Sequence, residues 1–322
     1  MKAMVYNKYG TTDVLKLKEV QVPTPKDNEV KVKVHAVSVN SWDWDLLRGK
    51  PFLARIGGLL KPKYKILGAD IAGRVEEIGR DVKHFHPGDE VFGDISWCGW
   101  GGFAEYVCVR EDALTLKLST MTFEEASAIP QAGVLALQGL RKGQIQEGHK
   151  VLINGAGGGV GTFALQIAKL YGSEVTCVDN TGKMDLLRSI GADYVIDYTQ
   201  EDLKGRCYDL ILDVIGSRSI FDYKRLLNPN GTYVMVGGSF SLILQIIFLG
   251  PVISRIEKKT MNILVHRPNK NDQNFLKDLF VDGTIVPIID KQYALSEVAE
   301  AIQYLGEGKA KGKVVIHVEQ KN

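Results

Sequence analysis

Residues 151–169 read VLINGAGGGVGTFALQIAK, which is a short apolar run, a glycine-rich string and then a helical pattern. Gly155 and Gly158 allow positive φ and a close approach of the backbone to a diphosphate, and Gly161 allows the helix to pack close to the strand. The start of that helix offers N–H groups and the positive end of its dipole to an anion. The strand–glycine–helix order therefore predicts a dinucleotide-binding turn. The alternative is a glycine-rich connection that only joins two elements.

The segments that follow this turn repeat strands and helices. Their strands are continuous apolar runs without alternation, as in a parallel sheet that helices cover on both faces. The sequence therefore predicts the α/β class with a doubly wound parallel sheet. Beside 151–153, the expected strands are 174–179, 194–198, 209–215, 231–238 and 261–266, and the expected helices are 159–171 and 183–190.

The first third of the chain has a different texture. Residues 30–39 alternate apolar and polar side chains, and further short strands are separated by glycine turns, which indicates a small barrel-like domain. A helical pattern begins at Phe123 and is broken at Pro130, and two helices (272–281 and 296–305) and a strand (313–318) close the chain. We expect a nucleotide domain over 123–267, inserted into a domain formed by 1–122 and 268–322.

Three residues bear on the choice of dinucleotide. Asp179 ends the second strand at about the 20-residue offset where an acid binds the adenosine ribose, which favours NAD(H) because a carboxylate repels a 2′-phosphate. Lys183, one turn further, and Tyr198, after the third strand, would instead suit NADP(H). In the alternative interpretation, Lys183 is a solvated helix residue and Tyr198 a capping aromatic.

The composition argues against several classes of protein, namely nucleic-acid-binding, membrane-spanning and secreted ones. With 322 residues, 45% hydrophobic and 24% charged, the chain fits two globular domains, and its net charge of +2 does not favour nucleic acid or an anionic membrane. Four scattered cysteines and a start without a secretory pattern predict a cytoplasmic protein. Residues 242–253 are nearly all apolar but shorter than the ~20 residues of a span, and Pro251 interrupts them, so we expect a core, cleft-wall or subunit contact and no integral membrane span.

The chain resembles zinc-independent members of the medium-chain dehydrogenase/reductase superfamily, in the quinone oxidoreductase (zeta-crystallin-like) branch. The resemblance implies a Rossmann domain inserted into a GroES-like β-barrel catalytic domain, a homodimer or homotetramer, and NADP(H) as the more common cofactor, with NAD(H) as the alternative. The stretches that carry it are VHAVSVNSWDWDLLRG (34–49), LGADIAGRVEEIG (67–79), PGDEVFG (87–93), GGFAEYV (101–107), LINGAGGGVGTFALQIAK (152–169), IGADYVIDYTQED (190–202), DLILDVIG (209–216) and KGKVVI (311–316).

The resemblance also implies positions around the cofactor. The turn around the pyrophosphate comprises Gly155, Ala156, Gly158, Gly159, Val160 and Gly161. Lys183 and Tyr198 match positions on the 2′-phosphate and adenine side, and Val214, Gly237 and Gly238 match strand ends beside the nicotinamide. Lys313 lies in a C-terminal motif that approaches the cofactor. Asp179 departs from the small or basic residues that are frequent in NADPH users.

The resemblance predicts no metal. Zinc-dependent members use a cysteine and a His–Glu pair, and this chain has Asn40 and Ala69–Asp70 in the matching places. Without a Lewis acid, the expected acceptor is already activated by conjugation, as in a quinone or an α,β-unsaturated carbonyl compound. The two alternatives are a non-catalytic NADPH-binding protein and an alcohol dehydrogenase-type carbonyl reductase.

Residues 40–49 are expected at the domain cleft, beside the acceptor. Asn40 is a candidate hydrogen-bond donor to it, and Trp42 and Trp44 are candidate walls, or else core residues. Asp45 stands where several reductases of this branch have a tyrosine, so water is expected to supply the proton. The apolar segments 51–62 and 242–253 are interpreted as walls of a pocket for a hydrophobic acceptor.

Overall fold

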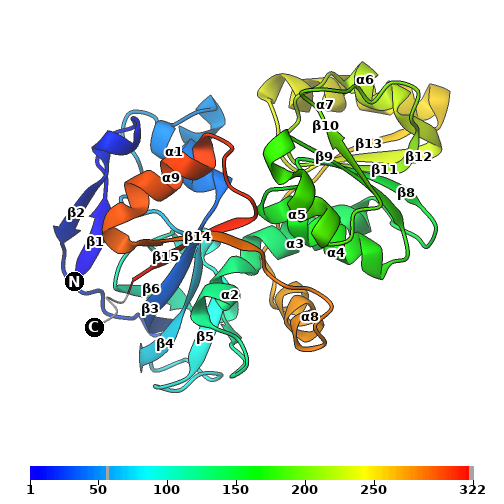
Figure 1. The fold of residues 1–322 in the computed structure, drawn as a ribbon. Coiled ribbons are helices and arrows are strands. Elements are labelled where there is room, and N and C mark those ends of the chain that lie inside the picture. The colour runs from blue at the N-terminus through cyan, green and yellow to red at the C-terminus, as the bar shows by residue number, and fades with distance from the viewer. Residues whose placement is uncertain (56–57, 319–322) are drawn as a thin grey trace. The chain divides into compact units, whose positions relative to one another are not determined.

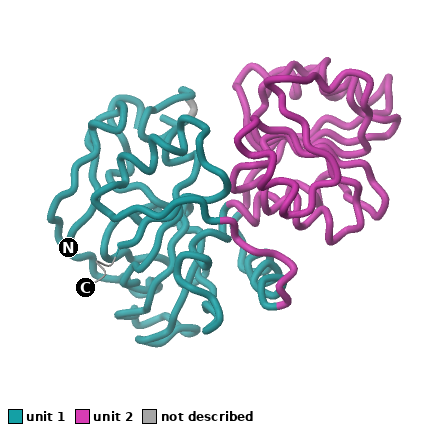
Figure 2. The backbone as a smooth tube through the Cα atoms, viewed as in Figure 1, with its two compact units in different colours: residues 1–131, 268–281, 289–322 teal, residues 132–267, 282–288 magenta. Residues whose placement is uncertain are grey.

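The computed structural model describes residues 1–55 and 58–318, which form two compact units (Figure 2). Unit 1 comprises residues 1–131, 268–281 and 289–322, and unit 2 comprises residues 132–267 and 282–288. Unit 2 is thus inserted between the two ends of unit 1, as the sequence indicated.

The unit boundaries differ from the predicted ones in two places. The predicted boundary at residue 123 falls before α2 (Phe123–Ala128), but this helix packs on strands of unit 1. The second difference is residues 282–288, which join unit 2 because the Gln166 side chain and the Val286 backbone exchange hydrogen bonds of 2.8 and 3.1 Å.

Unit 2 contains a six-stranded sheet in which every neighbouring pair is parallel (Figure 1). Its order is β10-β9-β8-β11-β12-β13. The strands are β8 (Lys150–Asn154), β9 (Glu174–Asp179), β10 (Tyr194–Asp197), β11 (Tyr208–Asp213), β12 (Leu227–Met235) and β13 (Thr260–Ile263). The helices are α3 (Pro130–Lys142), α4 (Gly159–Leu170), α5 (Met184–Ser189), α6 (Ile220–Arg225) and α7 (Phe240–Glu257). Each strand predicted after the glycine-rich turn is present within a few residues.

Helices cover both faces of this sheet. Gly139 and Gly143 let α3 approach Leu212 and Leu210 of β11. On the other face, α6 and α7 contribute Ile220, Leu242 and other buried side chains to one apolar cluster with β8, β9, β11 and β12. The prediction of a doubly wound α/β sheet is confirmed.

Unit 1 is built on a mostly antiparallel sheet of order β14-β15-β3-β4-β5-β7, with β6 paired to β3. β3 is long enough to pair with β6 through its first half and with β15 through its second, on the edge opposite β4. A separate pair joins β1 and β2. The strands are β1 (Lys2–Val5), β2 (Lys16–Glu19), β3 (Glu29–Val39), β4 (Asp70–Ile78), β5 (Glu90–Asp94), β6 (Tyr106–Arg110), β7 (Thr115–Leu116), β14 (Ile289–Ala294) and β15 (Lys313–His317).

The helices of unit 1, beside α2, are α1 (Ser41–Arg48), α8 (Lys270–Val281) and α9 (Val298–Gly306). Short 3₁₀ turns occur at Thr12–Val14, Phe52–Arg55, Ser96–Cys98, Glu111–Ala113 and Leu295–Glu297 in unit 1 and at Thr181–Lys183 in unit 2. The predicted break at Pro130 is confirmed, because α2 ends and α3 begins there. No strand was predicted at β14, which pairs in parallel with β15.

The segment 240–257 corrects two expectations. Pro251 does not interrupt it, because α7 continues through that residue. The whole helix has 18 residues and is about 27 Å long. Only 22% of the residues of α7 are buried, and its mean hydropathy is 1.6, so most of the helix is not part of the core. Phe248, Val252 and Ile256 are 70%, 52% and 73% exposed. By length and composition alone, α7 passes the test for a membrane-crossing helix, which is weak support for a span.

Candidate functional site

The topology of unit 2 marks a binding position at the carboxyl ends of β8 and β11. From β8 the chain proceeds to β9 and β10 on one side, and from β11 it proceeds to β12 and β13 on the other. In open α/β sheets, ligands bind at such a switch point, outside the carboxyl ends of the strands. The glycine-rich turn after β8 and the turn after β11 both lie at this position.

Three glycines of the turn have different reasons to be glycine. Gly155 has φ +83°, which favours glycine. A Cβ on Gly161 would lie 2.4 Å from the carbonyl oxygens of Gly155 and Ala156, so this residue lets α4 pack against the turn. Gly158 is the N-cap of α4 and extended, and a Cβ there would meet one protein atom, 3.8 Å away. The space above Gly158 is therefore open to a ligand.

The turn fits a diphosphate on these observations. The first N–H groups of any helix lack intrahelical acceptors, and here they belong to Gly159, Val160 and Gly161. They point along a helix dipole whose positive end is at Gly158. An open approach over glycine and unpaired donors are the two features that an anion needs at this place.

Asp179, at the end of β9, is buried and already has partners. Its Oδ2 accepts from the Gly157 N–H at 2.8 Å, and its Oδ1 lies 3.3 Å from Lys183 Nζ, with both side chains at least 91% buried. A Cβ on Gly157 would lie 2.4 Å from Lys183 Cδ, so the lysine crosses the turn at that glycine. Lys183 is thus not the solvated helix residue of the alternative interpretation, and its ammonium lies against the Asp179 carboxylate. The predicted contact of Asp179 with a ribose stays a prediction.

Tyr198 lies next to this pair. Its backbone N–H donates to the Asp179 carbonyl at 3.2 Å, and its side chain is 52% exposed. The Tyr198 side chain is therefore accessible, and its backbone is tied to the end of β9. The predicted contact with adenine stays a prediction.

The turns after β11 and β12 meet backbone to backbone. A Cβ on Gly237 would lie 2.5 Å from the Val214 carbonyl oxygen, and one on Gly216 would lie 2.5 Å from Gly238 Cα. Gly155 approaches the side chain of Ile215, since a Cβ on Gly155 would lie 2.7 Å from Ile215 Cγ1. The structure therefore brings together the glycine-rich turn and the predicted nicotinamide-side residues Val214, Gly237 and Gly238.

A buried carboxylate that the sequence analysis missed organises these turns. Asp213 is fully buried, and its Oδ1 accepts from Gly216 N–H and Asn154 Nδ2, both at 2.8 Å. Its Oδ2 accepts from the Tyr233 hydroxyl at 2.7 Å, and burial, followed by the Asp213 charge, raises the pKa of that tyrosine. An aspartate at the end of the apolar strand DLILD was the available signal.

Unit 1 contains a second buried polar cluster, which includes two predicted site residues. Lys313 Nζ donates to Asn40 Oδ1 at 2.6 Å and lies 3.6 Å from Asp70 Oδ2. Asn40 Nδ2 donates to the same Asp70 oxygen at 3.0 Å. Lys313 is 2% and Asn40 6% exposed, and Asp70 is fully buried. The Asn40 amide is thus already engaged with two buried charged partners, and its donation to an acceptor stays a prediction.

Burial shapes the charges of this cluster. It raises the pKa of Asp70 to about 6, against the opposing effect of the Lys313 ammonium, and it lowers the pKa of Lys313, against the opposing effect of Asp70. The Gln131 N–H also donates to both Asp70 oxygens at 3.2 Å. The charges of the ammonium and the carboxylate offset each other in this buried site.

Asp43 fixes the start of α1 beside this cluster. Its Oδ2 accepts from the Asn40 N–H at 2.8 Å, and its Oδ1 accepts from the Gly68 N–H at 2.9 Å. Burial raises the pKa of Asp43 to about 7. The side chain therefore holds the segment before β4 against the helix that follows Asn40.

This raised pKa predicts a pH-dependent stability. An acid whose folded pKa of about 7 exceeds its unfolded value of about 3.9 stabilises the fold below the unfolded pKa, and that contribution is lost as pH rises towards 7. We expect Asp43→Asn, measured against the wild type by denaturant unfolding, to gain relative stability between about pH 4 and pH 7. A difference in unfolding free energy that is constant over this window would contradict the raised pKa.

The remaining predicted residues of α1 differ in exposure. Trp42 is 47% exposed, whereas the Trp44 ring lies against Gly306 and under the Arg48 guanidinium at 4.7 Å, so Trp44 is the packed tryptophan of the alternative interpretation. Burial raises the pKa of Asp45 to about 6. Their roles towards an acceptor stay predictions, as does the place of residues 40–49 at a domain cleft.

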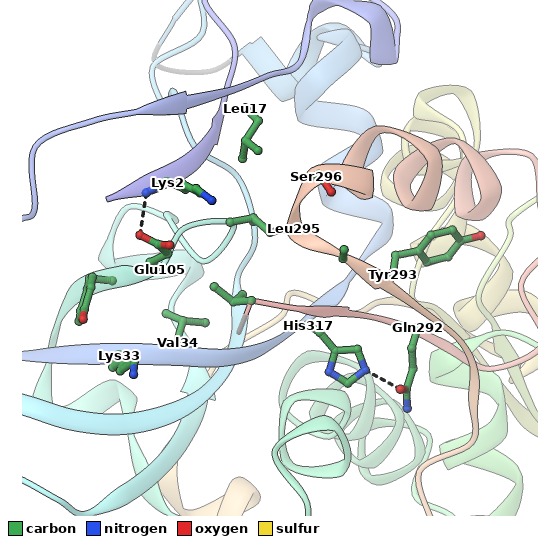
Figure 3. Close-up of a pocket in the computed structure, with 13 residues that line it drawn as sticks. Lys2, Leu17, Lys33, Val34, Glu105, Gln292, Tyr293, Leu295, Ser296 and His317 are labelled. Atoms are coloured by element: carbon green, nitrogen blue, oxygen red, sulfur yellow. Dashed lines mark hydrogen bonds between the residues drawn. The ribbon is translucent and has the colours of Figure 1, made fainter. Parts of the chain in front are cut away.

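A cavity of about 830 Å³ lies elsewhere in unit 1 (Figure 3). His317 and Gln292 share a hydrogen bond at its wall, and the Lys2 N–H donates to Glu105 at 2.7 Å. The predicted site residues are not among those that line it, so we assign it no part in the site. Its lining comprises Lys2, Leu17, Lys33, Val34, Glu105, Tyr106, Gln292, Tyr293, Ala294, Leu295, Ser296, His317 and Val318.

Among residues 1–55 and 58–318, no three His, Cys, Asp or Glu side chains are grouped as metal ligands would be. The positions predicted to replace zinc ligands, Asn40 and Asp70, instead surround the Lys313 ammonium. The predicted pocket wall 51–62 includes residues 56–57, which lie outside the described residues. Its described apolar side chains include Phe52, Leu59 and Leu60, and these are 69%, 61% and 92% exposed.

Known proteins are similar to this chain over almost its whole length. The model of the alcohol dehydrogenase GroES-like domain matches residues 26–119, and that of a zinc-binding dehydrogenase matches residues 190–316. The chain is 33% identical to the 2-methylene-furan-3-one reductase of Solanum lycopersicum, over 98% of this chain and 79% of the relative. It is 32% identical to the chloroplastic NADPH-dependent alkenal/one oxidoreductase of Arabidopsis thaliana, with the same coverage.

A solved structure agrees with these relatives. The quinone oxidoreductase of Coxiella burnetii superposes with a TM-score of 0.88 at 29% identity, over 99% of both chains. The similarity therefore includes both units and the connections between them.

Proposed function

Because this chain belongs to the medium-chain dehydrogenase/reductase family, in its quinone oxidoreductase branch, we propose that it reduces a quinone or an α,β-unsaturated carbonyl compound with NAD(P)H and without a metal. The observation that carries the proposal is the glycine-rich turn at the switch point of the unit 2 sheet, open above Gly158. The names of the relatives given above are those of reductases of a 2-methylene-furan-3-one, of alkenals or alkenones, and of quinones. The test is oxidation of NADPH by a panel of naphthoquinones and enones.

The residues of unit 2 divide the binding of the dinucleotide among themselves. Gly158 and the N–H groups of Gly159, Val160 and Gly161 hold the diphosphate, with Gly155 and Ala156 shaping the turn. Lys183, Asp179 and Tyr198 hold the adenosine side, and Val214, Gly237 and Gly238 support the nicotinamide side. When bound, the reduced nicotinamide supplies a hydride. Asp213 joins the turn after β11 to the end of β8 through its bonds to Gly216 and Asn154.

Lys313, which the resemblance assigned to the cofactor, has a second role in this proposal. Its ammonium orients the Asn40 amide, because Oδ1 accepts from Lys313 and Nδ2 then faces Asp70. This cation occupies the place between Asn40 and Asp70, and a Zn²⁺ ion there would be repelled by it. Asp45, with a pKa of about 6, is mostly ionised at neutral pH, so water is the proposed source of the proton.

We propose NADPH as the preferred donor of hydride. The Asp179–Lys183 ion pair supports this choice, because Lys183 offsets the carboxylate that would otherwise repel a 2′-phosphate. The Lys183 ammonium can then donate one hydrogen bond to that phosphate. A charge-assisted hydrogen bond of this kind contributes about 1.5–3 kcal/mol.

Lys183→Ala is therefore expected to weaken NADPH binding by about tenfold or more, while NADH binding changes by less than about threefold. Asp179→Asn should act in the opposite direction and strengthen NADPH binding. Titration of both nucleotides into each variant measures these effects, with Lys204→Ala as the control, since Lys204 is an exposed lysine of the same unit. Equal losses for NADPH and NADH would show that Lys183 only supports the turn.

We also propose a homodimer or homotetramer and a cytoplasmic location. The exposed apolar outer face of α7, with Leu244, Ile247 and Phe248, supports a contact between copies. Light scattering after gel filtration tests the oligomeric state, and a monomer at micromolar concentration would refute it. The location is supported by four cysteines that are free thiols in the structure.

A further inference from the structure

The connection between α1 and β4 has an unusual charge. Its residues 49–69 contain five basic residues and no aspartate or glutamate, although the whole chain has a net charge of only +2. Four of these, Lys50, Lys61, Lys63 and Lys65, are exposed. The net charge of the chain therefore conceals a local concentration of positive charge. This connection also joins Asn40, which precedes α1, to Asp70, which begins β4.

Large apolar side chains are exposed between these lysines. Leu60 is 92% exposed, and Phe52 and Leu59 are 69% and 61% exposed. Folded proteins hold single exposed apolar residues commonly, but three large ones in nine residues of sequence, surrounded by cations, indicate a surface that meets an apolar partner. We call Phe52, Leu59, Leu60 and the four exposed lysines the basic-apolar segment.

Tyr6 and Tyr9 fix the backbone on which the basic-apolar segment is carried. The Arg55 guanidinium stacks 4.7 Å above the Tyr9 ring, and the Tyr9 hydroxyl donates to the Gly58 carbonyl at 2.6 Å. Arg55 Nε donates in addition to the Gly49 carbonyl at 3.0 Å, and the Lys65 carbonyl accepts from the Tyr6 N–H at 3.0 Å. Leu59 and Leu60 follow directly after the Gly58 anchor, so they are presented outward from a supported base.

We propose that the basic-apolar segment docks on the surface of an anionic lipid bilayer. The leucines and Phe52 enter the boundary between headgroups and acyl chains, and the lysines remain at the level of the anionic headgroups. Charge complementarity selects this partner, because the connection that carries these apolar side chains contains exposed lysines and no acidic residue. The proposal is independent of the reaction proposed above.

A second copy of the chain fits the basic-apolar segment less well. A stable protein interface buries about 1,200–2,000 Å² in total, which is more than three apolar side chains supply. Two copies of the segment would also bring their lysines together, and like charges oppose association. The outer face of α7 has a longer apolar surface and is the better candidate for contact between copies.

Sedimentation with lipid vesicles tests the proposal. We expect the full chain to bind vesicles of phosphatidylglycerol and phosphatidylcholine at low salt, and to bind pure phosphatidylcholine vesicles at least about tenfold more weakly. Each lysine near an anionic surface contributes about fivefold to binding, so Lys61→Glu/Lys63→Glu should weaken it by at least about 25-fold. Leu59→Ser/Leu60→Ser should weaken it by about tenfold or more, and binding should fall as salt rises.

Two matched controls separate this surface from general effects. Lys142→Glu/Lys150→Glu makes the same change in net charge at two exposed lysines of unit 2, and Leu170→Ser/Val281→Ser removes two exposed apolar side chains that lie outside both the basic-apolar segment and α7. Both controls should bind anionic vesicles like the wild type, and thermal unfolding should show that all variants are folded. The proposal is overturned if the wild type does not bind, if the controls lose binding equally, or if the leucine variant changes the oligomeric state and not vesicle binding.

Discussion

Replacing Gly158 with valine is expected to weaken dinucleotide binding by at least about 100-fold and to leave the fold intact. The residue is extended, with φ −91° and ψ 178°, which suits a β-branched residue, and protein atoms leave its Cβ position open. The added side chain would instead occupy the space that a diphosphate needs above the turn. Calorimetric titration of NADPH measures the affinity, and thermal unfolding measures the stability.

The control for this prediction is Gly250→Val, in α7. A Cβ on Gly250 would meet its nearest atoms at 3.4 and 3.5 Å, which is ordinary van der Waals contact, so this change tests the cost of valine at a glycine outside the residues assigned to the dinucleotide. Gly161 would be a poorer choice for the test, because a Cβ there clashes with backbone and a loss of binding would follow from misfolding. Unchanged affinity in Gly158→Val would place the dinucleotide elsewhere.

The second large effect is expected from Lys313→Met. Removing one partner of a buried ion pair leaves the other charge uncompensated, which costs about 3–5 kcal/mol, and Asp70 is fully buried. We therefore expect the free energy of unfolding to fall by about that amount in denaturant titrations at neutral pH. Asn40 would lose its 2.6 Å partner in the same variant.

Adding Asp70→Asn to Lys313→Met should restore most of the lost stability, since the buried charge is then removed while an amide oxygen still accepts a hydrogen bond. This recovery separates an electrostatic cause from a loss of packing. If the free energy of unfolding of Lys313→Met is within about 0.5 kcal/mol of the wild-type value, the two buried charges do not stabilise each other.

The local sequence pattern was sufficient to predict the secondary structure of the nucleotide-binding half of the site. The strand predicted at 174–179 is β9 without a shift, and the predicted helix 159–171 matches α4 within one residue. A buried parallel strand, a glycine turn and a helix are each encoded by neighbouring residues, so their signals are strong. The Asp179–Lys183 pair lies four residues apart on one turn and was also visible in the sequence.

The clusters that join distant residues were not predictable in this way. Lys313 and Asn40 are 273 residues apart in sequence, and no local pattern indicates that β15 lies beside β3. Asp213 was read as part of an apolar strand, although a carboxylate in such a strand must find several donors. Pro251 predicts a break in the apolar segment, but α7 continues through it.

The most direct test of the proposed function is oxidation of NADPH by the purified chain, whose zinc content has been measured by elemental analysis. We expect turnover with a naphthoquinone or an enone in protein that holds far less than one zinc per chain, and no loss of rate after dialysis against a chelator. Tight NADPH binding without turnover on any acceptor would indicate a non-catalytic binding protein. Activity that a chelator abolishes and zinc restores would contradict the metal-free reaction.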